Sequence, residues 1–99
     1  MAKILLVGSR ADITHFVTVQ LLQEGWEVFP AVGPEEGLRQ LEGLDDVDAM
    51  IIGGPAAWAS REELSAALKR RHPYALVVYP TSPDTIGSQL HAAFGDTAN

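Results

Sequence analysis

The chain alternates between short apolar runs and longer segments in which apolar residues recur every three or four positions. The runs cover about residues 3–8, 27–32, 48–52 and 75–79, and each ends at a glycine or a proline. Runs of this kind are typical of strands that are buried on both faces of a sheet. Pro30 lies within the second run, and a proline cannot donate to a strand ladder, so we expect this strand at an edge of the sheet.

The segments between and after these runs predict four helices. We expect the first over about residues 12–24, with Asp12 as its N-cap, and the second from Pro34. Ser60 and Glu63 predict a capping box at the start of the third, and Ser82 is the expected cap of the fourth. The residues expected to face inward are Ile13, Phe16, Val17 and Leu21, then Leu38 and Leu41, then Leu64, Ala67 and Leu68, and finally Ile86, Leu90 and Phe94.

This alternation of strands and helices predicts one three-layer α/β domain over residues 1–99. Right-handed crossovers between the strands give a doubly wound parallel sheet with helices on both faces. With the second strand at an edge, the expected strand order is 2-1-3-4. The order reverses between the first and third strands, and sheets of this kind bind ligands at the carboxyl ends of the strands that flank the reversal.

Composition narrows the classes of function. The chain has no cysteine, which excludes disulfides and thiolate metal sites and fits a reducing cytoplasm, the expected location. The net charge of −6 argues against a nucleic-acid partner, and no apolar run is long enough to cross a membrane. The basic cluster Lys69–His72 ends a predicted helix, where cations balance the helix dipole. The three histidines form no metal-ligand pattern, so we expect neither a metal nor a cofactor.

Six segments carry a family resemblance. Lys3–Val7 looks like a first strand, Glu24–Val28 like the corner between the first helix and the second strand, and Gly33–Leu38 like the start of a second helix. Asp48–Ile52 looks like a third strand, Val77–Ser82 like a fourth strand with its switch threonine or serine, and Ala92–Asp96 like the end of the fourth helix. On these segments, which together span nearly the whole chain, the chain resembles the receiver domain of two-component response regulators. The resemblance implies a flavodoxin-like fold, and we expect the chain to be a receiver truncated after its fourth helix.

The residues that carry chemistry in receivers are replaced in this chain. The resemblance implies two magnesium-binding acids after the first strand, where Gly8 and Ser9 stand, and a phosphorylated aspartate at the end of the third, where Gly53 stands. The lysine that follows a fifth strand in receivers has no counterpart. A phosphoryl acceptor needs a carboxylate nucleophile, an acid-bound cation and a cationic clamp, so we expect no phosphoryl transfer and no enzyme.

A second resemblance is to the IIB components of sugar phosphotransferase systems. Asp48–Pro55 looks like their third strand and the turn after it. Their phosphorylated cysteine ends the first strand, where this chain has Gly8. Both resemblances therefore predict one scaffold without its phosphoacceptor.

The turns after three of the strands predict a candidate anion site. Its residues are Gly8, Ser9, Arg10, Gly53, Gly54, Thr81 and Ser82. Free N–H groups at a helix N-terminus, a hydroxyl and a guanidinium are the groups that bind phosphate or a nucleotide. The alternative is that these residues only form tight turns and caps, because the glycine-rich dinucleotide and P-loop signatures are absent.

The fourth strand predicts a candidate interface formed by Trp58, Leu76, Val78 and Tyr79. The strand is apolar on both faces and carries no charge or bulge, and exposed apolar edges pair with other chains. Trp58 lies in a loop of small residues, where it could anchor a partner, cover the crevice or pack into the core. The alternative for the strand is that the last helix covers it.

From these features we expect a non-phosphorylatable receiver-like domain that acts as a regulatory protein–protein interaction module. The expected partner is another protein or a second copy, with a homodimer favoured. Two alternatives stay open: an anion- or nucleotide-binding module, and a IIB-like protein without its cysteine.

Overall fold

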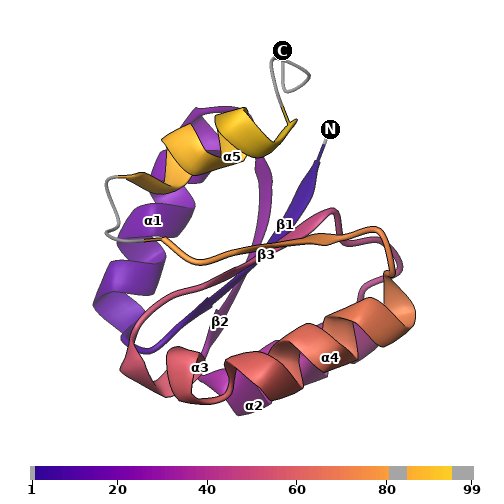
Figure 1. The fold of residues 1–99 in the computed structure, drawn as a ribbon. Coiled ribbons are helices and arrows are strands. Elements are labelled where there is room, and N and C mark those ends of the chain that lie inside the picture. Colours follow the sequence, from indigo (N-terminus) through magenta and orange to yellow (C-terminus); the bar gives the residue numbers. More distant parts are fainter. Residues whose placement is uncertain (1, 81–84, 95–99) are drawn as a thin grey trace.

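The computed structural model describes residues 2–80 and 85–94 and has the predicted α/β architecture (Figure 1). The elements are β1 (Lys3–Gly8), α1 (Ala11–Gln23), β2 (Glu27–Val32), α2 (Pro34–Gly43), β3 (Ala49–Ile52), α3 (Pro55–Ala59), α4 (Arg61–Arg71), β4 (Leu76–Val78) and α5 (Ile86–Phe94). The four strands form one parallel sheet in the order β2-β1-β3-β4, which confirms the predicted topology and places β2 at an edge. Helices α1 and α5 cover one face of this sheet, and α2, α3 and α4 cover the other (Figure 1).

The core is divided in two by the sheet because successive side chains of a strand point to opposite faces. Leu5 and Met50 pack toward α2 and α4, whereas Ile4 and Ile51 pack toward α1 and α5. Strands β1 and β3 are buried on both faces, as their uninterrupted apolar sequence predicts. No helix in the described ranges, 2–80 and 85–94, is long and apolar enough to cross a membrane.

Helix α1 turns a different face inward from the one predicted. Ile13 and Phe16 were expected in the core, but they are 42% and 57% exposed. Thr14 and Thr18 are buried in their place, beside Val17 and Leu21. The two threonine hydroxyls donate to the backbone carbonyls four residues earlier, each at 2.7 Å, so their burial leaves no polar group without a partner.

The start of α1 also differs from the prediction. The N-cap residue is Arg10, which makes no side-chain capping bond, and Asp12 lies in the first turn instead of capping it. A Cβ at Gly8 would collide with the Thr14 hydroxyl, so glycine at the end of β1 allows α1 to approach the sheet. The predicted N-cap was therefore wrong: the helix begins at Ala11, and its N-cap residue, Arg10, lies two positions before Asp12.

The loop that contains Trp58 is a short helix, α3, which was not predicted. Because α3 leads directly into α4, Ser60 is the residue between two helices, with its N–H donated to the Ala57 carbonyl at 3.1 Å. Ser60 makes no side-chain capping bond, so the predicted capping box does not form. Of the last predicted helix, the cap Ser82 lies outside the described residues, whereas Ile86 and Leu90 are buried in α5 as expected.

Candidate functional site

The carboxyl ends of β1 and β3 form a pocket of about 240 Å³, which we call the switch-point pocket. Five of the residues predicted for an anion site lie on its wall: Gly8, Ser9, Arg10, Gly53 and Gly54. The other two, Thr81 and Ser82, lie outside the described residues. The strand order therefore brings these five residues together around one pocket.

The Ser9 hydroxyl in this pocket already has three partners. It accepts hydrogen bonds from the N–H groups of Ala56 and Ala57, at 3.0 and 3.2 Å, and lies 3.4 Å from the Gly53 carbonyl, to which it donates. Ser9 thus caps α3 from a distant part of the chain. The N–H groups that an anion would need at this helix are occupied.

Gly54 makes this arrangement possible. Its φ of 86° lies in the left-handed region, and a Cβ there would lie 2.5 Å from the Ser9 Oγ. Gly54 is the N-cap residue of α3 and has no side chain that could cap it, so the Ser9 hydroxyl takes that role. The contacts of Ser9 and Gly54 therefore fit the alternative in which these residues form tight turns and caps.

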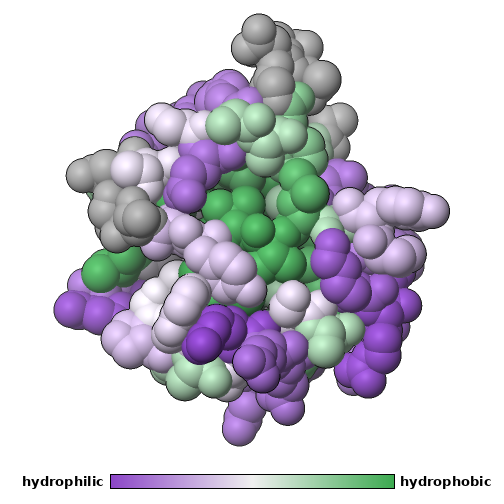
Figure 2. Space-filling model, viewed as in Figure 1, coloured by the Kyte–Doolittle hydropathy of each residue, from purple (hydrophilic) through white to green (hydrophobic). Residues whose placement is uncertain are grey.

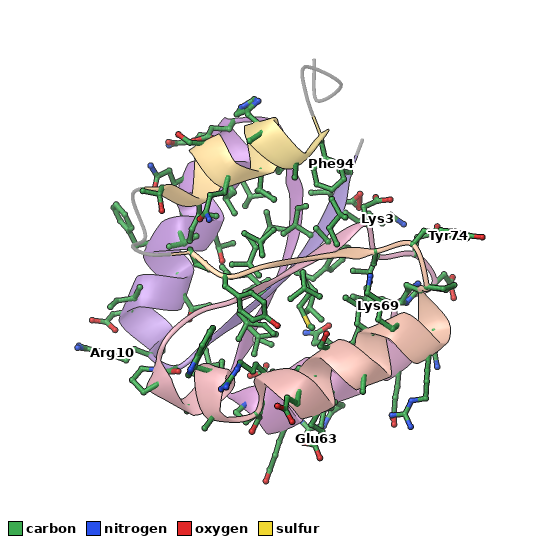
Figure 3. All side chains as sticks on the ribbon, viewed as in Figure 1. Lys3, Arg10, Glu63, Lys69, Tyr74 and Phe94 are labelled. Atoms are coloured by element: carbon green, nitrogen blue, oxygen red, sulfur yellow. The ribbon has the colours of Figure 1, made fainter. Side chains whose placement is uncertain are left out.

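Arg10 is paired with a carboxylate at the mouth of the pocket. Its Nη2 and Nε donate to the two oxygens of Asp12 at 2.9 and 3.2 Å, and both side chains are exposed. Figure 3 shows the Arg10 side chain pointing away from the sheet. The positive charge that was expected to hold an anion is therefore balanced by a neighbour and directed to solvent.

Gly8 and Gly53, which the resemblance to receivers aligns with acids, differ in the space around them. A side chain at Gly8 would collide with Thr14, as described above. At Gly53 the nearest atom to a Cβ is the Pro80 Cγ, at 3.9 Å, and the φ of Gly53 is not positive. The packing therefore excludes a carboxylate at position 8 and leaves room for one at position 53.

A second candidate site lies at the open edge of β4. Trp58 on α3 meets Tyr79 edge-on, with ring centroids 5.1 Å apart, and the Arg61 guanidinium lies 4.3 Å from the centre of the Trp58 ring. Arg61 also donates from Nη1 to the Trp58 carbonyl at 2.9 Å. Trp58 is 47% exposed and does not line the switch-point pocket, so it is neither a core residue nor a cover for that pocket.

We call this region the β4 edge surface and define it by Trp58, Leu76, Val77 and Tyr79. Leu76 and Tyr79 are exposed, as predicted for an interface, and Val77 is partly buried. Figure 2 shows an apolar area over β4 in the centre of this face. Val78 was also expected here, but it is only 8% exposed because it packs with the core between the sheet, α1 and α5.

The backbone of β4 is less open than its sequence predicts. The Leu76 N–H donates to the Asp48 carbonyl at 3.0 Å, so the backbone N–H and C=O groups of Leu76 point toward β3. In a parallel ladder these groups point to alternate sides along the strand. The backbone groups of Ala75, Val77 and Tyr79 therefore point away from β3, toward the open edge. The N–H of Ala75 is bonded to the His72 carbonyl, its C=O accepts from the Lys69 Nζ, and the Tyr79 C=O accepts from Gln89 at 3.5 Å.

The strand itself carries no charge, but a lysine from a neighbouring helix bonds to the residue that precedes it. Figure 3 shows Lys69 reaching from α4 toward the segment that precedes β4. A lysine and a very short strand are two ways in which proteins protect a sheet edge. The N–H and C=O of Val77 also point away from β3, and the hydrogen bonds described above do not involve them.

Comparisons of the chain with models of known protein families, with curated proteins and with solved structures find no match. The fold itself defines a class: a flavodoxin-like α/β domain with a four-stranded parallel sheet. Across residues 2–80 and 85–94, no group of three or more histidines, aspartates or glutamates lies close enough together to hold a metal ion.

Proposed function

We propose that this chain is a non-phosphorylatable receiver-like domain that acts as a regulatory protein–protein interaction module, and that its partner is a second copy. The observation that carries this proposal is the exposed Trp58–Tyr79 pair beside the open edge of β4. Tryptophan, tyrosine and arginine are the residue types that dominate binding energy at interfaces, and all three meet here. The cytoplasm remains the expected compartment.

The aromatic pair is held in place before any partner binds. The Tyr79 ring contacts one side of Trp58, and Arg61 fixes it through both its ring contact and its bond to the Trp58 carbonyl. Side chains that are already ordered lose less conformational entropy on association. The pair therefore supports an interface better than an equal area of mobile apolar side chains.

A second copy fits the backbone of this edge. A twofold axis would place two β4 strands antiparallel, with Val77 opposite the partner's Val77. Because the N–H and C=O of Val77 both face outward, this pair would exchange two hydrogen bonds. The same axis would bring the Tyr79 end of one strand to the Ala75 end of the other, beside Tyr74, which is 95% exposed in the single chain.

The switch-point pocket gives less support to the anion-binding alternative. Its serine hydroxyl, the N–H groups at α3 and its arginine all have partners within the chain. To bind Arg10, phosphate would have to displace the Asp12 carboxylate, which accepts two hydrogen bonds from the Arg10 guanidinium. No contact in the described residues favours a IIB-like role.

The test is the solution mass of the native chain and of two variants. Trp58→Ala should weaken dimerisation at least 30-fold or so, because an interface tryptophan contributes about 2 kcal/mol or more. Phe16→Ala is the matched control, since Phe16 is an exposed aromatic residue on α1, far from this surface in sequence. Circular dichroism should show that both variants are folded. Equal dimerisation of the two variants would contradict the location of the interface.

A further inference from the structure

We propose that the switch-point pocket binds a small uncharged apolar molecule, which goes beyond the interaction function and does not depend on it. The pocket has the position of a ligand site in sheets of this topology, but its wall has a different chemistry from the one predicted. Leu6, Val17, Ile51 and Ile86 form the buried part of this wall, and Ile13 lies at its exposed rim. The lining is therefore mostly aliphatic.

Three polar side chains of the wall already have partners within the chain. The Ser9 hydroxyl is bonded to the N–H groups of Ala56 and Ala57, and the Thr14 hydroxyl donates to the Arg10 carbonyl at 2.7 Å. Arg10 is paired with Asp12. An apolar ligand would leave all these bonds intact, whereas a charged ligand would lose its hydration and find few donors in exchange.

The size of the pocket indicates the size of the ligand. A cavity of about 150 Å³ lined by aliphatic and aromatic side chains is enough for benzene. The volume of about 240 Å³ here leaves room for a two-ring molecule such as indole or for a short branched chain. We therefore assign the site to one apolar ring system or one short aliphatic group.

Gly53 keeps the pocket open. It lines the pocket beside Pro80, and among the described residues the nearest atom to a Cβ at this position is the Pro80 Cγ, at 3.9 Å. A larger side chain at position 53 would extend into the space that a ligand needs. Because its φ is not positive, the backbone accepts such a side chain without strain.

The experiment is a titration of the full chain with indole, followed by the methyl resonances of Ile13, Ile51 and Ile86. We expect saturable shifts of these methyl groups with indole and none with inorganic phosphate in a parallel titration. Saturable shifts with phosphate alone would overturn the proposal and restore the anion site. Shifts confined to the Trp58 ring would also overturn it, because they would place indole at the β4 edge surface.

Two variants locate the binding. Gly53→Leu should fill the pocket and abolish the indole shifts, whereas the matched control Gly43→Leu should leave them unchanged, since a Cβ at Gly43 meets no atom of residues 2–80 and 85–94 within 4 Å. If Gly53→Leu does not fold, Ile13→Glu serves instead, because Ile13 is partly exposed and a carboxylate there should weaken indole binding at least 10-fold or so. Unchanged indole binding in the folded pocket variant would refute the proposal.

Discussion

The rings of Trp58 and Tyr79 meet at an interplanar angle of 81°, the edge-to-face geometry that aromatic pairs prefer. The two residues come from different elements, since Trp58 lies on α3 and Tyr79 follows β4. Their contact fixes an exposed apolar surface beside a sheet edge. It is the structural basis of the proposed interface.

The first prediction concerns Tyr79. Tyr79→Phe should leave the dimer intact, because the ring that contacts Trp58 is retained. Tyr79→Ala should remove that contact and weaken dimerisation by about 1 kcal/mol or more, roughly fivefold. Sedimentation of both variants over a range of concentrations measures the difference. If both variants weakened dimerisation equally, the contact between the Tyr79 and Trp58 rings would not be what stabilises the dimer.

The second prediction concerns the backbone of β4. Val77→Pro removes an N–H that faces away from β3, so the ladder between β3 and β4 should survive. A twofold pair would lose both of its hydrogen bonds, at about 1 kcal/mol each, and the dissociation constant should rise roughly 30-fold. Val77→Ala is the control, because it shortens the side chain and keeps the N–H. Native-like dimerisation of Val77→Pro would exclude strand pairing as the mode of association.

The third prediction separates two serines at helix starts. Ser9→Ala removes the hydroxyl that bonds to Ala56 and Ala57 and should lower the free energy of unfolding by about 0.5–2 kcal/mol. Ser60→Ala should change it by less than about 0.5 kcal/mol, because Ser60 makes no side-chain capping bond. Urea unfolding of the two variants provides the comparison. A larger loss for Ser60→Ala would mean that the predicted capping box forms after all.

The fourth prediction concerns phosphorylation. Incubation with acetyl phosphate and Mg²⁺ should give no phosphoryl adduct, since Gly8 and Gly53 occupy the positions that the resemblance to receivers aligns with acids. Gly53→Asp should also remain unmodified, because the collision of any side chain at Gly8 with Thr14 excludes a cation-binding acid there. Intact-mass spectrometry is the measurement. An adduct on the native chain would refute the description of this domain as non-phosphorylatable.

The sequence predicts the sheet well because the relevant signals are local. Uninterrupted apolar residues identify β1 and β3, and Pro30 alone places β2 at an edge. The inward face of α1 could not be predicted from hydropathy, because Thr14 and Thr18 become compatible with the core only through their own hydrogen bonds to the backbone. A pattern of apolar residues cannot identify a buried polar residue whose hydrogen bond is made within its own helix.

The sequence predicts which turns lie together at the switch-point pocket, but not the contacts that their polar groups make. Helix α3 is five residues long and has no detectable period, and its cap comes from Ser9, which lies 47 residues before Ala56. Without that contact, the same serine looks available to an anion. Lys69 likewise reaches Ala75 through the fold, so its protection of the β4 edge cannot be read from the strand alone. The Gly54-Pro55 pair was the available signal for α3, since proline favours the first position of a helix.

The most direct test of the proposed function is the solution mass of the native chain, measured by light scattering across a concentration series. The mass should rise from 10.7 kDa toward twice that value as concentration increases, and it should fall back to the single-chain mass in Trp58→Ala. A mass of 10.7 kDa at every concentration would contradict self-association through the β4 edge surface.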